Sequence, residues 1–367
     1  IYFFLNKEIF IENLHIKKNI FILSFLIMVI NIYGSGFSDD LDHYHNGFIA
    51  NADTFKFIWG QSFLQPWYGT SSAWLIGHSF FNFENFRLQD IHILNGLILF
   101  LVLGLLLTEL DFTIKKDVFY SPILFSLVIF ILLKYTRLKE FGIDKPASLI
   151  FCFLIYYYLK YFLKPNNKEI LKNFILVSLI SIFIFSIKIT YLPVLFFPLY
   201  IFLKDKIYLI KFDITCLIII FPCLVFILKN FLGTGCLFFP LEISCIESVS
   251  WSNLFWAKEL SVTGEFINKS WASYTGNLSE SDYVKNFNWV DTWLERSRVE
   301  LLEIFLTILL ILLLTFFSFN FRSVKNCFFD RFKNLKIILA TTLIFSISIF
   351  FLKNPVVRMN HHLLISM

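Results

Sequence analysis

Three carboxylates and two imidazoles fall within seven consecutive residues, soon after the first long apolar stretch. The cluster consists of Asp39, Asp40, Asp42, His43 and His45, with Tyr44 between the imidazoles. A carboxylate or an imidazole can take a proton from an attacking hydroxyl group, so these residue types suit general-base catalysis. Asp40 and Asp42 also suit a divalent cation such as Mg²⁺ or Mn²⁺, which binds carboxylate oxygens. The alternative is a solvated loop whose aspartates cap the next helix.

Basic side chains lie in the segments between later apolar stretches. The candidates for holding a phosphate group are Arg137, Lys145, Lys188 and Arg358, with Asp144 in support. A departing phosphate gains negative charge, which cationic side chains stabilise in the transition state. Lys188 lies between two apolar stretches, so its ammonium group either reaches the membrane interface or faces a polar cavity. Arg358 has the same two interpretations, and the sequence does not decide between them.

The elements that must position these groups are apolar helices. Hydrophobic residues make up 57% of the 367-residue chain and charged residues only 16%. A soluble core stops growing at about 250–300 residues, whereas lipid accommodates apolar blocks of about 20 residues as helices. We therefore predict an all-α, polytopic transmembrane bundle of about nine or ten spans. The predicted spans are 17–34, 91–107, 119–134, 147–163, 173–188, 190–203, 212–229, 300–320 and 336–352, with another starting near 362.

The distribution of basic residues predicts the orientation of the chain. Lys and Arg are concentrated in one set of connecting segments, which places that set in the cytoplasm: 1–19, 108–118, 160–172, 204–211 and 321–336. All eight Trp fall in the other set, within 35–90 and 230–299. These two segments are predicted to be large outer loops with interfacial helices. Segment 35–90 belongs to an N-terminal membrane region (1–229), and segment 230–299 separates that region from a C-terminal one (300–367). Their Trp either anchor the loops at the interface or form sugar-binding surfaces.

Cys236 and Cys245 lie in the second outer loop, where an oxidising compartment would let them form a disulfide. The sequence contains no CxxC or His/Cys zinc spacing, no internal repeat, no Gly-rich phosphate loop and no GxSxG. The net charge of +5 follows from the topology and does not indicate nucleic-acid binding. The chain begins at Ile1 and stops inside an apolar run at Met367, which is typical of a fragment truncated at its C-terminus or at both ends.

The acidic cluster, followed by aromatic amphipathic stretches at 55–69, resembles the first outer loop of the GT-C glycosyltransferases. Further segments strengthen the resemblance and look like a group of uncharacterised bacterial GT-C-like membrane proteins: 68–74, 141–147, 188–193 and 233–240. The resemblance implies transfer of a sugar from a polyprenyl-phosphate donor to an envelope glycan or lipid acceptor. It places the protein in the bacterial inner membrane, with the large loops periplasmic. The acidic cluster differs from the Asp-Glu pair common in characterised GT-C enzymes, which leaves the base open.

In this interpretation Asp39 or Asp40 acts as the base or as a metal ligand. Asp42, His43, Tyr44 and His45 support it, and the basic residues hold the phosphate. The alternatives are a non-enzymatic flippase or transporter for lipid-linked glycans, and a polysaccharide polymerase or ligase. Transporters usually carry ionisable residues within their spans or matched broken helices in two repeats. The predicted spans are nearly free of charge and no repeat is evident, which argues against a transporter.

Overall fold

The computed structural model describes residues 17–34, 41–55, 57–70, 72–80, 93–114, 120–135, 142–163, 170–207, 214–270, 276 and 278–318. Within these residues the chain is helical and holds no β-strand, apart from one isolated bridge between Cys236 and Cys245. The expected all-α class is therefore confirmed for this part of the chain. The spans expected at 336–352 and near 362 lie outside it.

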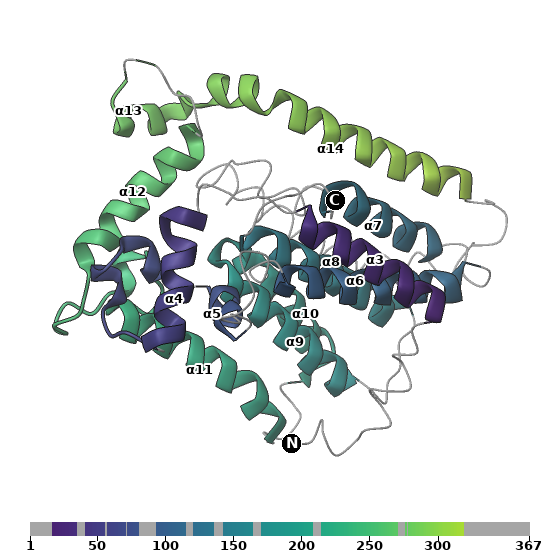
Figure 1. Ribbon diagram of the computed structural model, residues 1–367, viewed down its shortest axis with the longest axis horizontal. Helices are drawn as coiled ribbons and strands as arrows, with labels where there is room; N and C mark the ends of the chain where they lie inside the picture. The colour runs from purple at the N-terminus through teal and green to yellow at the C-terminus, as the bar shows by residue number, and fades with distance from the viewer. Residues whose placement is uncertain are drawn as a thin grey trace.

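The apolar helices follow the apolar blocks of the sequence (Figure 1). They are α3 (Lys18–Tyr33), α6 (Ile93–Thr113), α7 (Tyr120–Tyr135), α8 (Asp144–Leu163), α9 (Ile170–Ile187), α10 (Phe196–Lys204), α11 (Ile214–Thr234) and α14 (Val290–Ser318). Three helical stretches among the described residues are long and apolar enough to cross a membrane: Ile93–Thr113, Ile170–Ile187 and Leu217–Thr234. Their length and composition support membrane association, while the arrangement of nine or ten spans stays a prediction.

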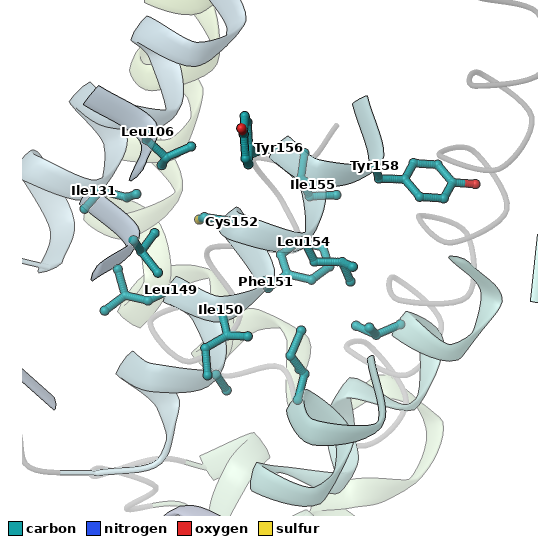
Figure 2. Packing of buried hydrophobic residues seen from close by; sticks show 14 of the residues in the cluster. Leu106, Ile131, Leu149, Ile150, Phe151, Cys152, Leu154, Ile155, Tyr156 and Tyr158 are labelled. Carbon is teal, nitrogen blue, oxygen red and sulfur yellow. The ribbon is translucent and has the colours of Figure 1, made fainter. Parts of the chain in front are cut away.

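Helix α8 lies at the centre of the bundle, in contact with α6, α7 and α9. Four consecutive residues of α8, from Leu149 to Cys152, are each no more than 5% exposed. Successive residues of a helix point to different faces, so α8 is covered on all sides at this level. Figure 2 shows these side chains beside Leu106 of α6 and Ile131 of α7. This core fixes where α8 begins, and therefore where Asp144 and Lys145 lie.

Two elements differ from the sequence expectation. The block at 190–203 is divided into a 3₁₀ segment, η6 (Ile189–Leu195), and the short helix α10. Pro193 lies inside η6, and a proline lacks the N–H that a regular α-helix needs in its interior. Helix α14 begins at Val290, inside the predicted outer loop, because its polar first turns contain good helix formers that hydropathy does not register.

Three polar side-chain pairs join neighbouring helix termini at one end of the bundle. The pairs there are Lys17–Asp111, Lys160–Glu109 and Tyr161–Asp205. They connect four of the segments that the basic-residue count assigned to one side, namely 1–19, 108–118, 160–172 and 204–211. These segments therefore share one end of the bundle, although the side of the membrane that this end faces stays a prediction.

The two predicted loops are built of short helices and pack against each other (Figure 1). The first loop contains η1 (Leu41–His45), α4 (Asn46–Phe55), η2 (Gln61–Phe63), η3 (Pro66–Thr70) and α5 (Ala73–Ser79). The second contains η8 (Glu242–Ser244), α12 (Leu254–Ser270), α13 (Glu280–Val284) and η9 (Lys285–Phe287). Asn253 Nδ2 donates to Ser62 Oγ at 3.2 Å across the two loops. Gly69 lies so close to the Phe239 ring that a Cβ there would be 2.5 Å from Cε1.

Candidate functional site

The ends of α3, α7 and α8 are joined through one buried ammonium group, that of Lys145. This residue lies in the first turn of α8 and is only 4% exposed. Its Nζ donates to Oδ1 of Asn31 at 2.8 Å, and Nδ2 of Asn31 donates to the Tyr135 carbonyl at 3.0 Å. Asn31 is itself buried, and both its amide oxygen and its amide nitrogen are hydrogen-bonded. The arrangement fixes the ammonium of Lys145 at this end of the bundle.

Lys188 and Asp144 form an ion pair beside this group. Lys188 follows the last residue of α9 in an extended conformation, while Asp144 is the first residue of α8. The Lys188 side chain is 11% exposed and that of Asp144 is 27% exposed. The ammonium of Lys188 therefore has a carboxylate partner, and whether this pair faces the membrane interface or a polar cavity stays a prediction.

One turn further along α8 from these charges, a hydroxyl group of α8 contacts a hydroxyl group of η6. Ser148 Oγ and Tyr191 Oη are 2.8 Å apart, and both residues are buried. Tyr191 belongs to η6, so this contact ties the segment after Lys188 to α8. The Phe151 and Phe197 rings pack beyond it. The polar cluster therefore ends where the apolar core begins.

His45 brings the acidic segment to the same place. It ends η1 and is 2% exposed. Burial lowers the pKa of His45 to about 4, and the negative charge of Asp144 opposes this shift. The ring is therefore neutral at pH 7. A neutral imidazole can donate or accept a hydrogen bond, but it carries no positive charge. The neighbouring Tyr44 ring meets His45 edge to face and stacks on Trp67 of η3.

The structure thus gathers four of the residues singled out from the sequence: His45, Asp144, Lys145 and Lys188. His43 lies in η1 with an exposed side chain, and Asp42 has its backbone in the same element. The remaining candidates lie outside the described residues: Asp39, Asp40, Arg137 and Arg358. The base and the divalent cation therefore stay predictions. Among the described residues, no group of three or more His, Cys, Asp or Glu could hold a metal ion.

Sequence reasoning missed Asn31, Ser148 and Tyr191 as members of this cluster. Asn31 is an amide near the end of the apolar block of α3, and Ser148 is a small polar residue near the start of that of α8. A polar side chain inside an apolar block signals a buried hydrogen bond, because an unpaired polar group in such surroundings costs free energy. Its partner cannot be read from the chain, since Lys145 is 114 residues away from Asn31.

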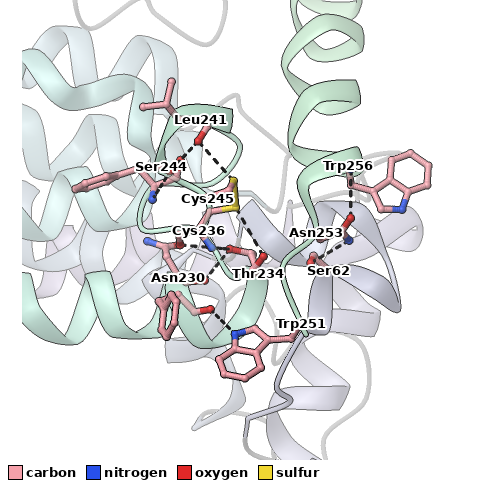
Figure 3. The surroundings of a disulfide bond; sticks show 12 residues. Ser62, Asn230, Thr234, Cys236, Leu241, Ser244, Cys245, Trp251, Asn253 and Trp256 are labelled. Carbon is pink, nitrogen blue, oxygen red and sulfur yellow. Dashed lines mark hydrogen bonds between the residues drawn. A yellow bond between two sulfur atoms is a disulfide. The ribbon is translucent and has the colours of Figure 1, made fainter. Parts of the chain in front are cut away.

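The second loop is held by the disulfide between Cys236 and Cys245, which lies at the end of α11 (Figure 3). The sequence had predicted this pair. Thr234 Oγ1 accepts from the Cys236 backbone N–H at 3.1 Å, and Ser244 Oγ accepts from the Phe238 N–H at 3.0 Å. These contacts close a compact turn that carries Phe239 against Gly69 of the first loop.

Two Trp of the second loop are buried. Trp289 and Trp293 are 1% and 3% exposed and pack with Tyr283 in a small core of their own. They are therefore covered by protein, which favours a folded loop domain over a sugar-stacking surface for these two. Lys269 Nζ lies 5.2 Å from the centre of the Trp289 ring and 2.7 Å from Glu265 Oε1.

The fold and the site together define a helical protein with candidate membrane spans and a buried polar cluster at the loop end of its bundle. The family model described as Domain of unknown function (DUF8201) matches residues 1–365, and the chain belongs to this family. No curated protein and no solved structure matches the chain.

Proposed function

We propose that the protein is a multi-pass membrane glycosyltransferase of GT-C type. It transfers a sugar from a polyprenyl-phosphate donor to a glycan or lipid acceptor on the outer face of the bacterial inner membrane. The observation that carries the proposal is the convergence of Lys145 and Lys188 at the end of the bundle where η1 emerges. The acidic cluster directly precedes η1 and continues into it, and His45 at the end of η1 feels the charge of Asp144, the neighbour of Lys145 and the partner of Lys188.

The two lysines provide the chemistry that a phosphate leaving group requires. In the transfer, the acceptor oxygen forms a bond to the anomeric carbon of the sugar while the bond from that carbon to the phosphate oxygen breaks. Negative charge then develops on the phosphate, and fixed ammonium groups stabilise it without reorganisation. Asn31 fixes one ammonium through a neutral amide oxygen, and Asp144 fixes the other through a carboxylate. Lys145 and Lys188 are accordingly the proposed phosphate ligands.

The acceptor hydroxyl must lose its proton in the same step, and Asp39 or Asp40 is the proposed base. A divalent cation, where one is used, would bind Asp40 and Asp42. His45 follows Asp42 within one turn of η1 and is neutral because it is buried. It supports the site as a hydrogen-bonding group and adds no charge to it.

The positions of the ionisable residues favour an enzyme over a transporter. The ion pairs that join the described bundle helices lie near helix ends: Lys160–Glu109 at one end and Lys188–Asp144 at the other. Transporters commonly place such groups midway along their spans, where substrate and coupling ions bind. A site at the end of the bundle suits a carrier whose phosphate lies at the surface of the bilayer.

The test combines capture of the carrier lipid with sugar transfer. Membranes containing the full chain are irradiated with a diazirine-bearing polyprenyl phosphate, and incorporation into the protein is measured. We expect Lys145→Met and Lys188→Met to lower incorporation at least fivefold, and Lys188→Arg to retain most of it. Lys160→Met is the matched control, because this lysine is also ion-paired but lies at the opposite end of the bundle.

Sugar transfer then separates the base from the phosphate ligands. Asp40→Asn and Asp42→Asn should keep the crosslink and lose transfer from a panel of polyprenyl-phosphate sugars. Full transfer activity in both variants would remove the acidic cluster from the mechanism. Equal incorporation of the probe in Lys145→Met, Lys188→Met and Lys160→Met would remove the phosphate site.

A further inference from the structure

Helix α11 carries an exposed apolar stripe along its outer face. Leu217, Phe221, Leu224 and Leu228 are 55%, 67%, 58% and 55% exposed. Their spacing of three or four residues places them on one side of the helix. The stretch Leu217–Thr234 is also the least buried of the three candidate spans, with 17% of its residues buried against 44% and 50% in the others. Protein therefore covers little of this face.

The first loop continues this stripe beyond the last turns of α11. Phe231 and Leu232 are the next residues on the same face, and the backbone carbonyl group of each accepts a hydrogen bond from a loop residue. The Gly60 N–H donates to the Leu232 carbonyl at 2.9 Å, and Trp251 Nε1 donates to the Phe231 carbonyl at 3.0 Å. The Trp59 ring meets the Trp251 ring at 5.2 Å. Trp59 thus lies directly past the end of the stripe.

The residues around this contact present a second apolar surface, which we call the ridge: Trp59, Phe63 and Leu64. They are 62%, 58% and 61% exposed. Gly60, between Trp59 and η2, has a φ of +64°, a conformation that glycine adopts without strain. The turn at Gly60 and the element η2 both contact α11, so the ridge lies beside the end of this helix.

The length of the helical stretch that carries the stripe indicates what covers it. The 18 residues from Leu217 to Thr234 span roughly 27 Å at about 1.5 Å per residue, close to the hydrocarbon thickness of roughly 30 Å. A bilayer that covers this stripe has its headgroup region at the end where the ridge lies. Tryptophan is enriched at that depth, because its ring is apolar with one polar N–H.

We propose that the ridge of Trp59, Phe63 and Leu64 is a membrane anchor that inserts into the headgroup region of the bilayer crossed by α11. Lipid is the occupant because the helix that carries the stripe is about as long as the hydrocarbon layer is thick, and the ridge lies at one end of that helix, where η2 contacts it. The anchor holds the first loop, and with it η1, at a fixed depth. It is independent of any sugar transfer.

Fluorescence quenching in vesicles tests the depth of the ridge. The full chain is reconstituted into phosphatidylcholine vesicles with bromines placed either near the headgroup end of the acyl chains or near their methyl ends. We expect the bromines near the headgroups to quench Trp59 more strongly. Trp59→Phe, which keeps an aromatic ring, should therefore lower the quenched fraction of the total emission.

Two further variants make the test independent of folding defects. Trp289→Phe is the control, because Trp289 is 1% exposed and its removal takes away an unquenched emitter. This change should raise the quenched fraction, opposite in sign to Trp59→Phe. Adding Leu64→Trp to Trp59→Phe should restore the quenching. An unchanged profile in Trp59→Phe, or stronger quenching by bromines near the methyl ends, would overturn the proposal. Complete protection of Trp59 in a dimeric protein would overturn it in favour of a second copy.

Discussion

Replacing Asn31 by alanine should destabilise the loop end of the bundle through the loss of one charge-assisted hydrogen bond. The amide accepts from Lys145 Nζ at 2.8 Å and donates to the Tyr135 carbonyl at 3.0 Å. A hydrogen bond to a charged group contributes about 1.5–3 kcal/mol in soluble proteins. Interhelical hydrogen bonds in membranes average about 0.6 kcal/mol. A charged donor roughly doubles the strength of a bond, so the membrane average gives an expected coupling of about 1.2 kcal/mol for this pair.

A double-mutant cycle isolates that coupling from the other consequences of each change. Asn31→Ala, Lys145→Met and the double variant are unfolded reversibly in mixed micelles of increasing SDS content, with Trp fluorescence as the signal. The double variant should be less destabilised than the sum of the single variants by about 1.2 kcal/mol. Lys145→Met alone removes the charge and leaves the oxygen of Asn31 without this donor.

The matched control is a buried amide with a neutral donor. Trp74 Nε1 donates to Asn95 Oδ1 at 2.7 Å, and both residues are buried. The cycle of Trp74→Phe and Asn95→Ala should give a coupling of about 0.6 kcal/mol. A coupling between Asn31 and Lys145 no larger than that of the control would refute the reasoning, because the ammonium would then gain nothing from its charge.

Three further changes test the loops and the buried imidazole. Opening the disulfide by Cys236→Ser with Cys245→Ser should lower the unfolding free energy by about 2.5 kcal/mol for its short loop. Dithiothreitol should lower the stability of the wild-type chain equally and leave the double variant unchanged. Gly69→Ala places a Cβ 2.5 Å from Phe239 and should cost about 1–3 kcal/mol, most of it recovered when Phe239→Leu removes the ring edge. Because His45 has a pKa of about 4 when folded and 6.5 when exposed, the unfolded chain binds the extra proton. Stability should therefore fall by up to about 3 kcal/mol as the pH drops from about 6.5 to about 4, and this fall should be absent in His45→Gln.

Hydropathy predicted the positions of the described apolar helices because an apolar block of this length has few other structures available. It was less accurate at helix ends. Helix α14 begins at Val290 and its first turns are polar, so the hydropathy pattern marked only its apolar part. Trp289 and Trp293 are buried against Tyr283 at that end. Tertiary packing therefore adds to the helix-forming residues of these turns in setting the start of the helix, and hydropathy records neither.

The candidate site was predictable in its residue types and not in its pairing. Asp144, Lys145 and Lys188 were identifiable because charges beside apolar blocks are few. The pairing of Lys188 with Asp144 joins residues 44 positions apart and depends on how α8 and α9 pack. The contact of Asn31 with Lys145 depends likewise on the position of α3. A single sequence carries the periodicity of each helix but not the rotation of one helix against another.

The ridge and the polar cluster are connected, and this connection predicts how the two act together. Elements η1 and α4 are in contact, α4 contacts α5, and α5 contacts α9 near the polar end, while η2 rests on α11. A polyprenyl carrier keeps its chain in the bilayer and its phosphate at headgroup depth, which is the depth that the ridge sets for the first loop. Phe63→Asn with Leu64→Asn should therefore weaken capture of the long-chain carrier phosphate in vesicles, although Lys145 and Lys188 are unchanged. A short-chain, water-soluble prenyl phosphate in detergent should bind the same variant as well as the wild type. Equal loss for both ligands would mean that the ridge supports the fold of the site and has no effect on its depth.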